Sequence, residues 1–309
     1  MPMSITSYIK DIGRGKDGAR NLSREQAADL FGQVLDGTAT DLQVGAFVLA
    51  MRIKGETPQE MAGFLDATSS RLNKVPTLGK PTVVLPSYNG ARKLPVLTPL
   101  LGLLLAREGL AVVVHGSASE DSRISTRNVL ETLDIPAQAA ITTIASGELQ
   151  FVPTALLSTG LVRLLEVRRA VGLRNSAHSL VKLMNPCDGP AMVVGSYTHP
   201  EYAVSMTDTL KLTHANALLL RGTEGEPVAD PRRTPAMDAI CHGECTRVQE
   251  AQSGTLAQLP NLPELHADST ARWTQDVLAG KLPVPAPIAQ QVAHIVRLSA
   301  QLSYTQPGH

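Results

Sequence analysis

The spacing of apolar residues changes near Pro76, and this change limits the folds open to the chain. Before Pro76 the sequence carries consecutive amphipathic helix patterns, and after it short apolar strands alternate with helices. Strand–helix–strand repeats are typical of an α/β domain, in which helices cover the faces of the sheet. We therefore expect a helical domain over residues 1–76 and an α/β domain over residues 77–309.

Three helix patterns lie within the first 74 residues. The first begins after Ser23, which is followed three residues later by Gln26 and so matches a capping box. Asp41 is the expected cap of the second helix, and Thr57 with Pro58 begins the third. Apolar residues at helical spacing predict the buried faces: Ala27, Leu30, Phe31, Val34, Leu35, Val44, Phe47, Val48, Met51, Met61, Phe64, Leu65 and Leu72.

The remaining chain shows strands and helices in alternation. A first strand–helix–strand unit is expected from strands at 82–85 and 111–114 with a helix at 99–108 between them. Further strands are predicted at 191–194 and 217–220. Further helices are predicted at 126–133, 154–165, 201–212, 270–279 and 287–302.

Composition excludes some modes of binding and leaves others open. Aromatic residues make up only 3% of the chain, which argues against a base-stacking platform. The formal net charge is +0, but residues 10–24 carry five basic and two acidic side chains, and residues 163–182 carry five and one. From residue 222 onward there are six basic and nine acidic side chains. A polarised surface is one interpretation, and ordinary solvated faces are the other.

The cysteines and the short apolar runs predict a cytoplasmic protein without a membrane span. Cys187, Cys241 and Cys245 are few and odd in number, and no charged-then-apolar leader is evident. Cys241 and Cys245 flank His242 and Glu244, but a second ligand pair for a tetrahedral metal site is missing. We expect free, partly buried cysteines and no metal site.

Several segments resemble the anthranilate phosphoribosyltransferase family, and together they cover nearly the whole chain. They are residues 47–57 (FVLAMRIKGET), 115–133 (HGSASEDSRISTRNVLETL), 167–186 (VRRAVGLRNSAHSLVKLMNP) and 192–200 (MVVGSYTHP). The resemblance implies a small helical domain that also dimerises, completed by helices around 166–184. It also implies a larger α/β domain with a central mixed sheet and a cleft between the two domains.

The family's diphosphate loop is altered in this sequence. In that family a Gly-Thr-Gly-Gly-Asp loop wraps the diphosphate of phosphoribosyl diphosphate with backbone amides, since glycines allow close approach. The aligned segment here is Pro86, Ser87, Tyr88, Asn89 and Gly90. The proline removes an amide donor, the tyrosine adds bulk, and the carboxylate of the last position is lost.

Other family positions are partly kept. His115, Gly116 and Ser122 match the family, and Arg169 resembles the arginine that meets its aromatic acid substrate. With the loop residues 87–90 they make up a vestigial substrate cleft.

The family's acidic pair, which holds Mg²⁺, aligns with Pro227 and Val228. Glu224 and Glu226 lie nearby. We expect them to be solvated loop residues, and metal binding from these shifted positions is the alternative. No catalytic residue and no cofactor are therefore predicted, and Mg²⁺ would be needed only if transferase chemistry persisted.

Basic residues surround the altered loop. This combination resembles the TrpD2 branch of the family, whose bacterial members are called YbiB-like. The segments that carry this resemblance are residues 12–23 (IGRGKDGARNLS), 88–93 (YNGARK) and 218–227 (LLLRGTEGEP). Members of that branch are dimers that bind nucleic acid, which implies sequence-independent binding through the phosphate backbone. The predicted contacts are Lys10, Arg14, Lys16, Arg20, Arg24, Arg92, Lys93 and Lys182. The alternative is a phosphoribosyl or glycosyl transferase with altered substrate binding.

Overall fold

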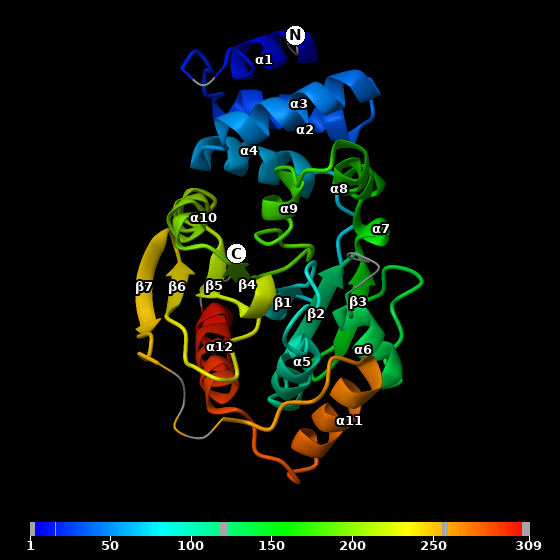
Figure 1. Cartoon of the computed structure of the whole chain (residues 1–309), viewed down its shortest axis with the longest axis vertical. Coiled ribbons are helices and arrows are strands. Elements are labelled where there is room, and N and C mark those ends of the chain that lie inside the picture. The colour runs from blue at the N-terminus through cyan, green and yellow to red at the C-terminus, as the bar shows by residue number, and fades with distance from the viewer. Residues whose placement is uncertain (1–3, 16, 118–122, 255–256, 258, 305–309) are drawn as a thin grey trace.

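The computed structural model describes residues 4–15, 17–117, 123–254, 257 and 259–304. Its amino-terminal part is a helical layer at one end of the molecule (Figure 1). This layer contains α1 (Ile5–Ile12), α2 (Arg24–Leu35), α3 (Asp41–Lys54) and α4 (Pro58–Ser69). Two later helices, α8 (Thr159–Val171) and α9 (Ala177–Leu180), contact α2 and α4 respectively. The helical layer is therefore built from two separate stretches of sequence.

The described residues include a seven-stranded mixed sheet with the order β3-β2-β1-β4-β5-β6-β7. The strands are β1 (Thr82–Pro86), β2 (Ala111–Gly116), β3 (Leu149–Pro153), β4 (Ala191–Tyr197), β5 (Asn216–Arg221), β6 (Met237–Cys241) and β7 (Glu244–Gln249). The first five are parallel to one another, β6 pairs with β5 in the antiparallel direction, and β7 pairs with β6 in the antiparallel direction. The strand order reverses at β1, with β2 on one side and β4 on the other. Ligands of open α/β sheets bind beyond the carboxyl ends of strands at such a reversal.

Alternate residues of each strand enter two different cores, as the pleat of a β-strand requires. Val83 and Leu85 lie in a core shared with α5 and α12, whereas Val84 lies in a core that continues into the helical layer. The other elements are α5 (Thr98–Arg107), α6 (Thr126–Thr132), α7 (Thr154–Leu157), α10 (Pro200–Leu212), the 3-10 turn η1 (Thr223–Gly225), α11 (Ala267–Leu278) and α12 (Ala286–Tyr304). One face of the sheet is thus joined to the helical layer by a continuous apolar core.

The helical layer is centred on phenylalanines, which the helical spacing predicted to be buried. The rings of Phe31 and Phe64 stack with centroids 4.6 Å apart, and Phe47 meets Phe64 edge-on at 6.0 Å. Aromatic pairs with these geometries add to the free energy gained from burial. The contact fixes α2, α3 and α4 against one another.

The helix starts are predicted well by capping signals, with one error. Ser23 forms the expected capping box, and Thr57, the expected start of the third helix, forms one with Glu60. The prediction that Asp41 caps the second helix is wrong by one residue. Thr40 is extended, its hydroxyl accepts from the Gln43 amide, and the Gln43 side chain accepts from the Thr40 amide. Asp41 becomes the first helical residue, where its charge suits the helix dipole.

Two other expectations differ from the structure. The helix predicted at 154–165 is two helices, because Ser158 is extended and its hydroxyl caps α8 at Leu161. Strands β3, β6 and β7 were not expected. All the β7 side chains are exposed or only partly buried, so this edge strand lacks the apolar alternation that would reveal it.

Candidate functional site

The altered loop follows β1 and lies at the reversal of the strand order. The amide of Ser87 donates to the His115 carbonyl at 2.8 Å, which joins the loop to β2. A Cβ atom at Gly116 would lie 2.1 Å from the Ser87 carbonyl oxygen, so only glycine fits there. Gly90 has a φ of 67°, a left-handed conformation that also favours glycine. The loop is therefore held in one shape by its neighbours.

The carboxylate of Glu226 fills the inner side of this loop. Its Oε1 accepts from the amides of Asn89 at 2.8 Å and Gly90 at 2.9 Å. Its Oε2 accepts from the hydroxyls of Ser87 at 2.5 Å and Thr98 at 3.0 Å, with that of Thr126 at 3.4 Å. Glu226 is only 1% exposed. The expectation that Glu226 is a solvated loop residue is therefore wrong.

Glu224 holds the outer side of the same loop. Its carboxylate accepts from the amides of Arg92 at 2.5 Å and Lys93 at 2.8 Å, and its carbonyl accepts from the Asn89 side chain at 2.7 Å. Glu224 is partly exposed but is bound to the loop rather than freely solvated, so that expectation is corrected as well. The segment after β5 thus supplies anionic ligands to the loop after β1.

The residues present do not fit a bound magnesium diphosphate. Two of the loop amides that would face phosphate oxygens already bind Glu226. The carboxylates of Glu224 and Glu226 accept hydrogen bonds from the loop. Pro227 and Val228, which align with the family's acidic pair, are buried, and their side chains contain no oxygen. Mg²⁺ requires hard oxygen ligands, and the two carboxylates of the rearranged segment are engaged by the loop instead.

Tyr88 and His115 form a polar contact behind the loop. The Tyr88 hydroxyl lies 2.8 Å from His115 Nδ1 and 2.9 Å from Thr154 Oγ1, which joins the loop to β2 and α7. Burial lowers the pKa of His115 to about 3 and raises that of Tyr88. Both groups are therefore neutral near pH 7, and their hydrogen bonds hold the loop against β2 and α7.

Lys182 is turned into the protein. Its amine donates to the carbonyls of Gly225 at 2.9 Å and Ser196 at 3.4 Å, and the side chain is partly buried. It was predicted to be a contact to nucleic acid, but its amine instead holds the segment that carries Glu224 and Glu226. Lys182 lies between the apolar residues Val181 and Leu183, which are both buried. This apolar setting is the sequence signal that could have indicated a partly buried lysine.

The stability of the protein is expected to depend on Lys182 at high pH. Burial lowers the pKa of Lys182 from 10.5 to about 8. Because the folded chain holds this proton less tightly than the unfolded chain, the wild type should gain stability as the pH rises from about 8 to about 10.5. In a Lys182→Met variant this gain is absent. Urea unfolding of both proteins across this range would test it, and a difference in unfolding free energy that does not change with pH would contradict it.

Five of the other predicted cations form two groups, one at the end of α1 and one after β1. Lys10, Arg14 and Arg20 are exposed at the end of α1 and on the loop after it, at the outer end of the helical layer. Arg92 and Lys93 are exposed on the loop after β1. Lys16 and Ser122 lie outside the described residues.

Two predicted arginines have acidic partners within their own domain. Arg24 forms a two-pronged ion pair with Asp66, at 2.6 and 2.8 Å, and donates to the Leu212 carbonyl of α10. Arg169 is exposed on α8 and pairs with Glu166 at 2.6 Å. Both therefore contribute less positive charge to the surface than the sequence suggests.

Arg232 and Arg233 were missed by the sequence reasoning because they lie in the acidic last third of the chain. Both pair with Asp230, at 2.9 and 3.3 Å. Arg232 also interacts electrostatically with Glu224. The Glu224 carboxylate accepts hydrogen bonds from the backbone amides of Arg92 and Lys93. We call Arg92, Lys93, Arg232 and Arg233 the strand-end patch.

Cys241 and Cys245 lie in the β6–β7 hairpin. His242 and Gly243 have φ values of 54° and 81° and form its tight turn. Cys241 pairs with Glu244 and Ile240 with Cys245, so the two sulfurs point to opposite faces of the sheet. They cannot bind one metal ion together. Burial raises the pKa of both thiols.

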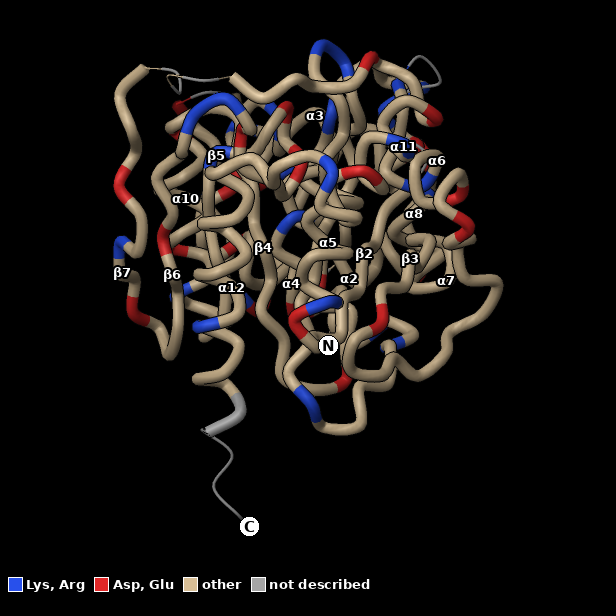
Figure 2. Tube along the Cα trace, turned by 90° about the horizontal axis from the view of Figure 1, so that it is seen from below, with Lys and Arg blue, Asp and Glu red and all other residues tan. Residues whose placement is uncertain are grey.

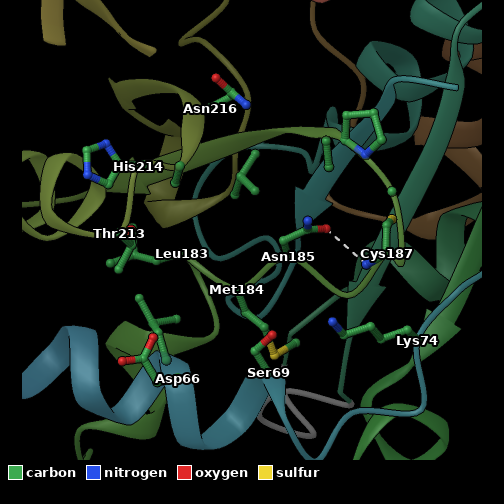
Figure 3. A pocket seen from close by; sticks show the side chains of 16 residues that line it. Asp66, Ser69, Lys74, Leu183, Met184, Asn185, Cys187, Thr213, His214 and Asn216 are labelled. Atoms are coloured by element: carbon green, nitrogen blue, oxygen red, sulfur yellow. Dashed lines mark hydrogen bonds between the residues drawn. The ribbon is translucent and has the colours of Figure 1, made fainter. Parts of the chain in front are cut away.

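A cavity of about 320 Å³ lies elsewhere, between α4 and the amino ends of β4 and β5. Figure 3 shows Asp66 and Ser69 of α4 on one side, with Asn185 hydrogen-bonded to the Cys187 amide on another. The Asp66 carboxylate is already paired with Arg24. None of the predicted site residues lines this cavity, which is at the opposite end of the strands from the altered loop.

Comparison with known proteins follows the same division into a helical part and an α/β part. Residues 6–70 match the helical bundle domain of the glycosyl transferase family. The structure superposes on anthranilate phosphoribosyltransferase from Thermus thermophilus with a TM-score of 0.71, at 19% identity, over 98% of this chain and 90% of that one. The same enzyme from Saccharomyces cerevisiae, in complex with PRPP and Mg, gives 0.69 at 14% identity over 96% and 89%. In the part of the chain that the structure describes, none of the helices is both long and apolar enough to cross a membrane.

Sequence relatives are similar over nearly the full length. The chain is 38% identical to the uncharacterized protein YbiB of Escherichia coli (strain K12), over 94% of this chain and 93% of that protein. It is 30% identical to an anthranilate phosphoribosyltransferase of Idiomarina loihiensis, over 91% and 86%. The chain therefore belongs to the anthranilate phosphoribosyltransferase-like family of glycosyl transferases and is a YbiB-like member of it.

Proposed function

We propose that the protein is a homodimer that binds nucleic acid without sequence specificity, through the phosphate backbone. The observation that carries this proposal is the separation of charges around the altered loop. Glu226 is buried within the loop and Glu224 is bound to its amides, whereas the side chains of Arg92 and Lys93 are exposed. Such a surface attracts phosphates, while the pocket for a small diphosphate is already filled.

The strand-end patch carries more positive than negative charge. Its four cations, Arg92, Lys93, Arg232 and Arg233, lie with two carboxylates, those of Glu224 and Asp230. The Glu224 carboxylate is engaged by backbone amides rather than by a basic side chain. A phosphate group could therefore approach the patch without displacing the hydrogen bonds that hold the loop.

The loop after α1 supplies a second basic surface. Arg14 and Arg20 both face Asp11, at 3.4 and 4.0 Å, so two guanidinium groups share one carboxylate. Lys10 is exposed nearby on the last turn of α1. Acidic and basic segments are otherwise interspersed along the described trace in Figure 2. Binding must therefore depend on local patches, which a two-fold dimer would duplicate.

An exposed apolar stripe on α3 supports dimerisation through the helical layer. Leu42, Leu49 and Ile53 are 85%, 45% and 64% exposed and lie at helical spacing on one side of α3. Gly45 lies on the same side and has open space around it. An exposed apolar stripe of this kind is typical of a contact with another protein. In a two-fold dimer the stripe of one copy would pack against the same stripe of the second copy.

Reversing two charges of the strand-end patch is expected to weaken binding. For a Lys93→Glu, Arg233→Glu variant we expect the affinity for a labelled single-stranded DNA to fall by at least about tenfold. The slope of log affinity against log salt should decrease by roughly one for each phosphate that the variant no longer neutralises. Fluorescence anisotropy between about 50 and 200 mM salt measures both quantities.

Lys281→Glu is the control, since the Lys281 side chain is 71% exposed, follows α11, and pairs with Asp276 rather than with a residue of the strand-end patch. It should leave the affinity close to that of the wild type. Equal effects of the control and the double variant, or no binding by the wild type at the lower salt concentration, would argue against this function.

A further inference from the structure

The cavity between α4 and the amino ends of β4 and β5 has opposite charges on two of its sides. Figure 3 shows Asp66 and Thr213 on one side and Lys74 on the other, with Met184 between them. The volume of about 320 Å³ suits a small molecule. We propose that this cavity is a binding site for a short zwitterionic peptide of apolar residues. The inference does not depend on nucleic-acid binding.

The side that holds Asp66 suits the ammonium group of such a peptide. Asp66 pairs with Arg24, but its side chain is 44% exposed, and each carboxylate oxygen can accept a further hydrogen bond. Helices α4 and α10 both end at the cavity, where Ser69 is the last residue of α4 and Thr213 follows α10. The carboxyl end of a helix carries about half a negative elementary charge. A positive group beside Asp66 is therefore stabilised.

The side-chain amide of Asn216 can accept a hydrogen bond from the same ligand. Asn216 begins β5 and lines the cavity, and its Oδ1 is buried with no hydrogen-bond donor among the described residues. A buried acceptor without a donor destabilises the folded chain. A half-turn of this amide toward a ligand would break no hydrogen bond at the oxygen, and a peptide supplies N–H donors at its amino end and along its backbone.

The side that holds Lys74 suits the carboxylate of the peptide. Lys74 is exposed, and no hydrogen bond or ion pair joins its amine to another residue in the part of the chain that the structure describes. Asn185 lines the same cavity, and because its Oδ1 accepts from the Cys187 amide, its amide nitrogen is left to donate. An ammonium group and an amide N–H are both donors, so they favour an anionic oxygen.

Apolar side chains line the part of the cavity between these polar groups. Leu183, Met184 and Val193 are only 4%, 2% and 2% exposed. They would contact apolar side chains of the ligand and disfavour charged ones. In a free amino acid the ammonium and the carboxylate share one carbon atom, whereas Asp66 and Lys74 lie on different sides of the cavity. A dipeptide separates the two charges and so matches the site better.

The test uses the dipeptide L-leucyl-L-leucine as the probe. Three related molecules each lack one feature: the N-acetylated dipeptide has no ammonium, the dipeptide amide has no carboxylate, and free L-leucine does not separate its charges. Isothermal titration calorimetry and thermal unfolding of the full chain are the readouts. No nucleic acid is present, so the outcome is separate from that of the proposed function.

We expect the dipeptide to bind the wild type and to raise its unfolding temperature. Each of the three related molecules should bind at least about tenfold more weakly, because a charge-assisted contact is lost or misplaced. Lys74→Met should weaken binding of the dipeptide by at least about tenfold and leave binding of the dipeptide amide unchanged. Lys80→Met is the matched control, since Lys80 is also exposed but contacts Ser146 outside the cavity, and it should change neither affinity.

Three results would overturn the inference. The first is no binding of the dipeptide to the wild type at concentrations up to about 10 mM. The second is an equal affinity for the dipeptide and for any of the three related molecules. The third is an effect of Lys74→Met on dipeptide binding that is no larger than that of Lys80→Met.

Discussion

A variant with Leu49→Glu and Ile53→Glu is expected to be monomeric and to lose most of its affinity for nucleic acid. Both side chains lie on the exposed apolar stripe of α3. Two carboxylates per chain in a self-complementary contact would place four negative charges in one apolar interface, where charge is costly to bury. A monomer also presents half as many cations, so it neutralises fewer phosphates.

Light scattering coupled to size-exclusion chromatography measures the mass, and fluorescence anisotropy measures the affinity. Val204→Glu is a matched control, because Val204 is 67% exposed on α10 and lies outside the stripe. It should change neither quantity. A double variant that stays dimeric, or a wild type that is monomeric, would show that α3 is not the contact.

Glu60→Ala is expected to lower the free energy of unfolding by about 3 to 5 kcal/mol, because it leaves a buried lysine without its counter-ion. Glu60 and Lys54 form an ion pair at 2.7 Å with side-chain exposures of 0% and 6%. Glu60 also accepts from the amides of Leu22 at 2.9 Å and Thr57 at 2.8 Å. The carboxylate therefore joins the end of α3, the start of α4 and the chain entering α2.

Urea denaturation of both proteins measures the difference in unfolding free energy. Glu131→Ala is the comparison, since Glu131 pairs with Arg127 one turn away and both side chains are largely exposed. Pairs of that kind contribute about 0.3 to 0.5 kcal/mol. A loss of stability at Glu60 no larger than that at Glu131 would mean that Lys54 finds another partner or reaches water.

The sequence predicted the parts of the fold that depend on neighbouring residues. The capping boxes at Ser23 and Thr57 involve residues three positions apart, and the buried faces of α2 and α4 follow from helical spacing. The strands β1 and β2 were recognisable as apolar runs because both are fully buried. The exposed strand β7 has no such signal.

The candidate site could be located from the sequence, but its chemistry could not. The resemblance placed the altered loop correctly at the end of β1, yet Glu226 was expected in solvent. Its donors at Asn89 and Thr98 lie more than a hundred positions earlier in the chain, and no local pattern connects them. A glutamate between glycine and proline is ordinary loop composition, so only the folded chain shows what it contacts.

The filled loop bears on how a diphosphate could be accommodated at the end of β1. Writing acidic residues at positions 227 and 228 would add negative charge beside Glu226, which already satisfies the amides of Asn89 and Gly90. Such a change alone should therefore fail. The loop can be vacated only if the resident glutamate is removed in the same step, so accommodating a diphosphate there requires coupled substitutions rather than single ones.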